Sequence, residues 1–184
     1  LIRAFAAVRA RNQEALLALT IDDVNETLRA ELLELIEQLN LSGEVAVLGS
    51  VWERLPCLYS ICDLYCTPSV MEGFGMSAEE AAASGKPIVS SNLVPFVREY
   101  LLGDDPQKVP VEGSTELLVG RGAIVAEADD VGAFAAALEL LLSDEELRLR
   151  MGNEALDATV PSFSWKAIAE ELLTAVVPQG AGGD

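Results

Sequence analysis

Two hydrophobic periodicities alternate along the chain, and together they predict its secondary structure. Apolar residues recur at helical spacing over residues 1–11, and a continuous apolar run over 15–20 follows, which is more typical of a buried parallel strand than of a second helix. The same succession repeats along the rest of the chain. We expect helices over 1–11, 24–39, 54–62, 96–102, 131–142 and 165–177, two further helices from Ser77 to Ser84 and from Ser143 to Leu156, and strands over 15–20, 44–48, 64–67, 87–91 and 122–125.

The order of these elements indicates the fold class. Helices that alternate with strands throughout predict an α/β fold with a doubly wound parallel sheet of the Rossmann-like kind, which binds ligands at the carboxyl ends of its strands. We expect one domain over residues 1–178 and a loose tail at 179–184. Residues 104–121 contain acidic residues, prolines and glycines, and we predict an exposed excursion without regular structure there.

Side-chain oxygens precede several of the predicted helices and are expected to cap them. The expected caps are Asp22-Asp23, Asp129-Asp130, the capping box that begins at Ser143, and Ser164. Pro56 falls in the first turn of its helix, where the missing N–H does no harm.

A glycine-rich turn, Glu72-Gly73-Phe74-Gly75-Met76-Ser77-Ala78-Glu79-Glu80, lies between a predicted strand and a predicted helix. Glycines at such a crossing let backbone N–H groups approach a ligand closely, and the helix N-terminus behind them favours an anionic ligand. Glu72 lies in the loop and Glu80 lies about one turn into the helix. We therefore expect both carboxylates to face one cleft.

The same residues also have a purely structural interpretation. Ser77 fits an N-cap, with Glu80 as the residue that reaches back to it in a capping box. A capping box would explain these two residues, but it would leave the Gly-Phe-Gly sequence and Glu72 unexplained.

Composition narrows the classes of function. The 184 residues, 51% of them hydrophobic, suffice for one domain with a sizeable core. The formal net charge of −18 leaves no basic face to neutralise phosphates, so we expect no nucleic-acid partner. No apolar run approaches the length of a membrane span.

The absence of histidine limits the chemistry that these residues can supply. It excludes a Ser-His-Asp triad, a histidine base and every histidine-containing metal site within the chain. Cys57, Cys62 and Cys66 have no fourth thiolate and match no zinc pattern, so we expect them to be reduced and mostly buried, as in a cytoplasmic protein. We expect neither a metal ion nor a cofactor.

The glycine-rich motif resembles the signature of a known family. Glu72 stands within Pro68-Ser69-x-x-Glu72-Gly73-Phe74-Gly75, seven intervening residues separate it from Glu80, and Gly85-Lys86-Pro87 follows. This pattern is similar to the motif of the retaining nucleotide-sugar glycosyltransferases of family 4 (group 1). The likeness extends to Leu58-Tyr59-Ser60-x-x-Asp63-Leu64 and to Phe163-Ser164-Trp165, so it covers nearly the whole chain.

This resemblance implies the C-terminal, donor-binding half of a two-domain GT-B fold. The first strand of such a sheet is central, and we expect it to be missing just before Leu1, together with the loop whose basic residues neutralise the donor diphosphate. The implied partners are a nucleotide-sugar donor and an N-terminal acceptor-binding domain of the same polypeptide. The implied reaction moves the sugar to an acceptor hydroxyl with retention at the anomeric carbon.

The resemblance also assigns roles to residues. Glu72 would hold hydroxyls of the donor sugar and Glu80 those of the ribose, which suits carboxylates because they accept charge-assisted hydrogen bonds from hydroxyl pairs. The N–H groups of the loop would hold sugar hydroxyls and the diphosphate, and the backbone after the second predicted strand would lie near the base. These further donor-binding residues are Gly73, Phe74, Gly75, Met76, Ser77, Ser50 and Val51.

Several residues keep two interpretations. Arg98 and Arg121 are the nearest basic candidates for phosphate, although solvated surface arginines are commoner. Trp165 could mark the return of the last helix to the partner domain, or it could simply pack at a helix start. The acidic insertion within 92–121 departs from the family, which leaves donor contacts from that loop open. The alternative functions are a non-catalytic GT-B-like binding module and another GT-B enzyme, such as a nucleotide-sugar epimerase.

Overall fold

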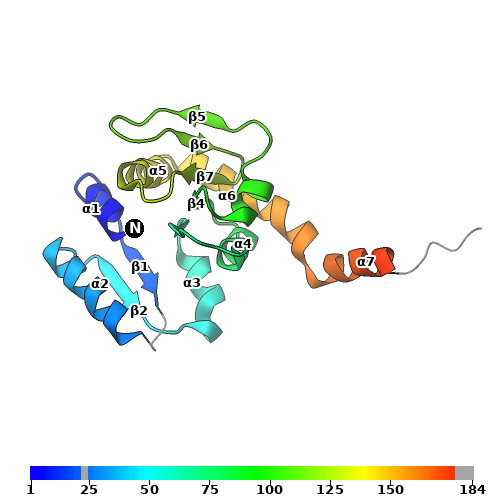
Figure 1. Ribbon diagram of the computed structural model, residues 1–184, viewed down its shortest axis with the longest axis horizontal. Helices are drawn as coiled ribbons and strands as arrows, with labels where there is room; N and C mark the ends of the chain where they lie inside the picture. Colours follow the sequence, from blue (N-terminus) through cyan, green and yellow to red (C-terminus); the bar gives the residue numbers. More distant parts are fainter. Residues whose placement is uncertain (22–24, 177–184) are drawn as a thin grey trace, which may run out of the picture.

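A computed structural model describes residues 1–21 and 25–176, and its helices and strands alternate along most of the chain (Figure 1). The helices are α1 Ile2–Arg9, α2 Glu26–Gln38, α3 Leu55–Ile61, α4 Met76–Ala83, α5 Val131–Ser143, α6 Glu145–Phe163 and α7 Trp165–Val176, with short helical turns η1 Trp52–Arg54 and η2 Val97–Leu101. The strands are β1 Leu17–Thr20, β2 Val45–Leu48, β3 Tyr65–Thr67, β4 Ile88–Ser91, β5 Gln107–Val109, β6 Leu117–Val119 and β7 Ala123–Ala126. Every predicted strand and helix is present, so the α/β prediction is confirmed.

The strands form two separate sheets. β1 and β2 pair in parallel as a two-stranded unit, and the other five follow the order β3-β4-β7-β6-β5. β3, β4 and β7 are parallel to one another, and all four residues of β4 and of β7 are buried, as expected for central parallel strands. Among the described residues, β1 pairs only with β2 and β3 only with β4, so each of the two leaves one edge without a partner strand.

The segment 104–121 corrects the prediction of an irregular excursion. It contains β5 and β6, which pair antiparallel and extend the sheet beyond β7. Leu117 is buried within this hairpin, and Gly113 takes a positive φ of 73° in its connection. The two strands have only three residues each, so their periodicity was too short to stand out beside the prolines and charges that flank them.

Two hydrophobic layers cover the larger sheet. Alternate residues of β4 and β7 point to opposite faces, so that Val89 and Ile124 contact the layer that contains α5 and α1, whereas Ile88 and Val125 contact the layer that contains α4 and η2. Figure 1 shows α1 beside α5, on the side where β1 and β2 lie. The packing of α1 on α5 therefore attaches the two-stranded unit to the rest of the domain.

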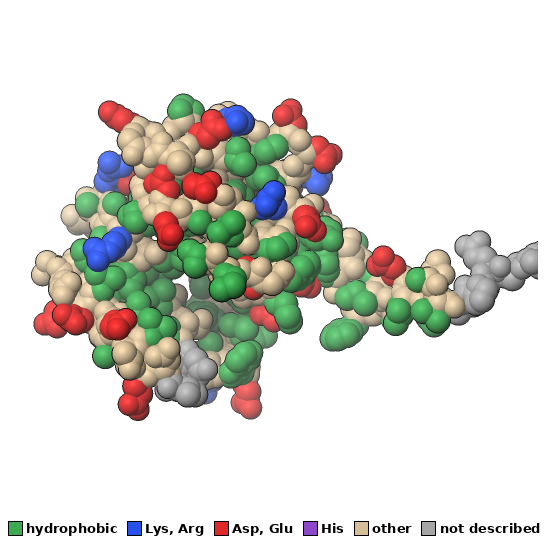
Figure 2. All heavy atoms as spheres, viewed as in Figure 1, with side chains coloured by type: hydrophobic (Ala, Val, Ile, Leu, Met, Phe, Trp, Pro, Cys, Tyr) green, Lys and Arg blue, Asp and Glu red, His purple; other side chains and the backbone are tan. Residues whose placement is uncertain are grey.

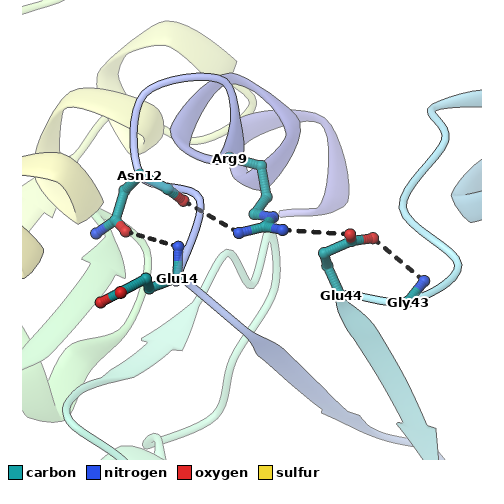
Figure 3. Close-up of polar contacts among 5 residues, drawn as sticks. All are labelled: Arg9, Asn12, Glu14, Gly43 and Glu44. Atoms are coloured by element: carbon teal, nitrogen blue, oxygen red, sulfur yellow. Dashed lines mark hydrogen bonds and ion pairs between the residues drawn. The ribbon is translucent and has the colours of Figure 1, made fainter.

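Polar contacts near the end of α1 also connect this helix to the start of β2 and to α5. Arg9 donates to the carboxylate of Glu44 at 3.2 Å and to the carbonyl oxygen of Asn12 at 3.4 Å, and so links the end of α1 to the start of β2 (Figure 3). Glu44 in turn accepts from the N–H of Gly43 at 3.1 Å. Arg11 adds an ion pair to Glu139 of α5 at 2.6 Å.

The helix caps agree with the sequence in part. Asp130 and Ser164 cap α5 and α7, accepting from the N–H groups of Ala133 and Ala167. Ser143 is instead the last residue of α5, and Asp144 caps α6, which continues through Pro161 to Phe163 rather than ending at Leu156. The expected cap Asp22-Asp23 and the predicted tail at 179–184 lie outside the described residues. Asn25 caps α2.

α7 extends away from the body of the domain and buries none of its residues (Figure 1). Its large apolar residues are exposed, and Trp165 at its first position is 89% exposed. The interpretation of Trp165 as an aromatic packed at a helix start is therefore wrong for this structure. Within residues 1–21 and 25–176, no helix is long and apolar enough to cross a membrane.

Candidate functional site

A cleft of about 1740 Å³ lies between the open edges of β1 and β3. It is lined along its length by both strands and at the carboxyl ends by the turn after β2 and the first turn of α4. Figure 2 shows the surface hollowed next to the two-stranded unit, with hydrophobic side chains around the opening. Of the residues predicted for the site, Ser50, Val51, Met76, Ser77 and Glu80 line this cleft.

Gly75 sets the direction in which the chain enters α4. It has a φ of +108° and immediately precedes the helix, which starts at Met76. A Cβ on Gly75 would lie 2.6 Å from Cγ1 of Val94, so both the conformation and the space require glycine there. A Cβ on Gly73 would meet nothing within 4 Å, so the first glycine of the motif has no such steric reason.

This start of α4 removes the capping-box interpretation. Gly75 is the N-cap, and no side chain caps the helix. Ser77 is already the second helical residue, so its hydroxyl and the Glu80 carboxylate are not engaged in capping. Both groups project from the first turn and a half of α4 at the cleft.

Two tyrosine hydroxyls form hydrogen bonds to residues of this turn of α4. The Tyr65 hydroxyl donates to Oγ of Ser77 at 2.8 Å, and the Tyr59 hydroxyl lies 3.1 Å from Oε2 of Glu80 and 3.2 Å from the carbonyl oxygen of Ser77. Their rings meet edge to face with centroids 6.0 Å apart. Burial, followed by the negative charge of Glu80, raises the pKa of Tyr59, so its hydroxyl stays protonated.

The loop residues before α4 lie apart from the cleft lining. Glu72 is half-buried and accepts from the N–H of Gly73 at 3.2 Å and from Oγ of Ser69 at 3.4 Å. Phe74 packs its ring against Phe96, with centroids 5.5 Å apart. The residues that line the cleft do not include Glu72, Gly73, Phe74 or Gly75, so the expectation that both carboxylates face one cleft holds for Glu80 alone.

The two arginines considered from the sequence as phosphate ligands, Arg98 and Arg121, do not line the cleft. Arg98 is exposed on η2, and Arg121 lines a small separate pocket together with Glu154 and Asp157. Arg3 of α1 and Arg148 of α6 line the cleft instead. Arg148 donates to the carbonyl oxygen of Leu141 at 2.8 Å, which fixes its direction, whereas Arg3 is exposed.

Two further groups at the cleft were not predicted. Trp52, in the turn after Val51, lines the cleft and is 81% exposed. Cys62 and Cys66 also line it; all three cysteines are free, but Cys57 is exposed and the other two are half-buried, which corrects the expectation that they are mostly buried. The sequence indication for Trp52 was a tryptophan directly after Val51, the last residue of the predicted ligand turn.

Comparison with known proteins shows which sequence family this chain matches. The sequence model of the family described as "Glycosyl transferases group 1" matches residues 1–157. The D-inositol 3-phosphate glycosyltransferase of Corynebacterium efficiens is 36% identical over 120 residues, which are 65% of this chain and 24% of that enzyme. The MMP alpha-(1->4)-mannosyltransferase of Mycolicibacterium hassiacum is 33% identical over 142 residues, 76% of this chain and 30% of that enzyme.

Solved structures share the fold. A glycosyltransferase from Rickettsia africae superposes with a TM-score of 0.77 at 18% identity, over 95% of this chain and 42% of that one. Anabaena HepE in complex with UDP superposes with a TM-score of 0.75 at 19% identity, over 95% of this chain and 43% of that one. The chain therefore spans less than half the length of these relatives, and its fold is the Rossmann-like fold of GT-B glycosyltransferases. With a family match that covers most of its residues, the chain belongs to the glycosyl transferases of group 1.

Proposed function

We propose that this chain is the donor-binding part of a retaining glycosyltransferase, which moves a sugar from a nucleoside-diphosphate sugar to an acceptor hydroxyl. The observation that carries the proposal is the position of Glu80 and Ser77. Both project into the cleft at the carboxyl ends of the strands, where doubly wound sheets bind their ligands, and neither is needed to cap α4. The membership in group 1 supports the reaction class.

The chemistry of the cleft suits a nucleoside diphosphate. Glu80 would accept hydrogen bonds from the ribose hydroxyls, because a carboxylate suits a hydroxyl pair and would repel a phosphate. Phosphate oxygens would meet the Ser77 hydroxyl and the N-terminus of α4, where N–H groups and the helix dipole favour an anion. The backbone at Ser50 and Val51 would lie near the base. Glu72 would meet the donor sugar, with Gly73, Phe74 and Gly75 supplying backbone groups in a loop that reaches the donor when the site is complete.

We propose UDP as the first nucleotide to test. Anabaena HepE, which shares this fold, is described in complex with UDP and with UDP-glucose. In this scheme no metal ion is needed, because N–H groups and Arg3 would meet the diphosphate.

We further propose that a strand and an N-terminal acceptor-binding domain complete the protein. A strand seated in the cleft would pair with the open edges of β1 and β3 at once, and it could lead into α1 by a right-handed crossover. Leu1 and Ile2 line the same cleft, which places the start of α1 within reach. The exposed apolar face of α7 would contact the acceptor-binding domain, and the whole protein would act in the cytoplasm.

Amide hydrogen exchange of the 184-residue chain with and without UDP, GDP or ADP tests this proposal. We expect slower exchange in the turn around Ser50 and in the first turns of α4, with one nucleotide giving the larger effect. The hairpin of β5 and β6 is the internal control and should not change. Protection that is absent from both predicted segments with all three nucleotides would contradict the proposal.

A further inference from the structure

The Glu80 carboxylate has a defined direction although it is exposed. Among the described residues, the only hydrogen bond given to this carboxylate is that from the Tyr59 hydroxyl to Oε2, at 3.1 Å. Glutamate has three side-chain torsions, so an exposed glutamate on the surface of a helix would otherwise sample many rotamers. The Tyr59 bond holds Oε2 on the side of α3 and leaves Oε1 for another donor.

The donor itself is rigidly placed. Tyr59 is buried beneath α4, packs edge to face against Tyr65, and belongs to the core layer that contains Ala78, Ala81 and Ala82 of the same helix. Its hydroxyl lies within hydrogen-bonding distance of two oxygens, the carbonyl of Ser77 and the carboxylate of Glu80, but it has only one hydrogen to donate. The carboxylate is the stronger acceptor because it is charged.

From this geometry we infer that Tyr59 is a positioning residue: it orients the Glu80 carboxylate so that the cleft selects nucleotides with an intact ribose hydroxyl pair. The inference rests on the proposed function and deepens it, because it names the group that makes ribose recognition specific. Tyr59 lines the cleft, but its hydroxyl is engaged by the Ser77 carbonyl oxygen and the Glu80 carboxylate, so we assign it no part in bond cleavage. Its effect passes entirely through Glu80.

The role of Tyr59 can be measured as the difference in affinity between nucleotides with and without the ribose hydroxyls. A site built to hydrogen-bond a hydroxyl discriminates strongly against an analogue that lacks it, because the polar group of the site is then left without its partner. A carboxylate held in one rotamer meets both hydroxyls without first losing side-chain freedom, whereas a mobile carboxylate must be ordered by the ligand. Loss of the Tyr59 hydroxyl should therefore weaken the binding of UDP and leave the binding of 2′,3′-dideoxy-UDP unchanged.

Calorimetric titration of UDP and 2′,3′-dideoxy-UDP into four forms of the 184-residue chain tests the inference: wild type, Tyr59→Phe, Glu80→Ala and the double variant. We expect Tyr59→Phe to weaken UDP about tenfold and to leave the dideoxy analogue unchanged, an effect on the scale of one hydrogen bond to a charged group. In the Glu80→Ala background, Tyr59→Phe should have no further effect on UDP. Tyr100→Phe is the matched control, since Tyr100 lies in the aromatic cluster with Phe96 and Phe163, away from the cleft.

Each other outcome overturns the inference in a recognisable way. Equal weakening of both nucleotides by Tyr59→Phe would mean that the hydroxyl supports the fold of α4 in general. An unchanged UDP affinity in Tyr59→Phe, with affinity lost in Glu80→Ala, would mean that Glu80 needs no positioning. Wild-type protein that binds neither nucleotide would remove the proposed function together with the inference. Glu80→Asp gives a second check at an exposed position, because its shorter side chain should lose the Tyr59 bond and the preference for UDP together.

Discussion

Val94 occupies the space that a side chain at Gly75 would need at the start of α4, and this close approach restricts position 75 to glycine. A side chain at position 75 would meet Cγ1 of Val94 at 2.6 Å, in a backbone conformation that L residues rarely adopt. Val94 is fully buried and cannot give way. The backbone of the same loop is tied to the next segment by the N–H of Phe96, which donates to the carbonyl oxygen of Phe74 at 2.9 Å.

Gly75→Ala should therefore destabilise the domain. We expect the free energy of unfolding to fall by about 2–4 kcal/mol, from overpacking against Val94 and from the positive φ. Urea unfolding at neutral pH measures the difference. Gly73→Ala is the control, because the same methyl group meets nothing there. Equal losses in the two variants would contradict the steric role of Val94.

Asp130 links the β5–β6 hairpin to α5, and its contribution to stability should depend on pH. Its carboxylate accepts from the N–H of Thr115 at 2.7 Å and from the N–H of Ala133 at 2.9 Å. These hydrogen bonds, that from Thr115 first, lower the pKa of Asp130. A lowered pKa in the folded state means that the stabilisation is complete above the ordinary aspartate pKa of about 3.9 and is lost as the pH falls toward the lower folded value.

Asp130→Ala should thus cost about 1–2 kcal/mol at pH 7, the usual scale for an N-cap. The difference from wild type should begin to shrink once the pH drops below about 4. Urea unfolding measured over that pH range gives the difference in the free energy of unfolding between Asp130→Ala and wild type. Asp105→Ala removes an exposed carboxylate from the same part of the chain and serves as the control. A difference that grows with acidity would have the wrong sign for this explanation.

The open edges of β1 and β3 allow a test of the proposal that a further strand completes the sheet. A strand of alternating valine and isoleucine, joined to Leu1 through a short glycine-containing loop, should seat in the cleft and pair with both edges. We expect the free energy of unfolding to rise by roughly 1–3 kcal/mol, the surplus of apolar burial over the entropy of ordering the strand.

Amide exchange distinguishes pairing from a general effect of the extension. Exchange should slow in β1 and β3 and stay unchanged in β6. The control extension carries proline at alternate positions, which cannot donate to a neighbouring strand. If both extensions act alike, the cleft is not a strand site.

The sequence predicted the parts of this structure that depend on long, regular patterns. The buried runs at β4 and β7, the amphipathic helices and the cap at Asp130 follow from periodicity and local chemistry, and they are confirmed. β5 and β6 escaped prediction because prolines and charged residues flank these three-residue strands and hide their short apolar pattern. The glycine-rich motif indicated where the cleft would lie, but a capping box and a ligand site use the same residue types at the same spacing.

The remaining features of the site depend on contacts between distant segments. That Tyr59 reaches Glu80 follows from the packing of α3 beneath α4, which the spacing of apolar residues in either helix does not specify. Likewise, Arg3 and Arg148 reach the cleft from α1 and α6, while the arginines nearest the motif in sequence do not. Glu72 turns toward its own loop, and the sequence alone could not distinguish that position from one in the cleft.

The most direct test of nucleotide binding is a thermal-shift series with UDP, GDP and ADP on wild type, Glu80→Ala and Glu79→Ala. Glu79 is the matched control, because it carries the same charge one residue away and does not line the cleft. At about a hundred times its dissociation constant, a ligand stabilises the folded state by roughly 2.7 kcal/mol, which in a domain of this size corresponds to about 5–11 °C. A shift with one nucleotide that persists in Glu79→Ala and disappears in Glu80→Ala is the predicted result. A cooperative melt that none of the three nucleotides moves, or a shift that survives in Glu80→Ala, would contradict it.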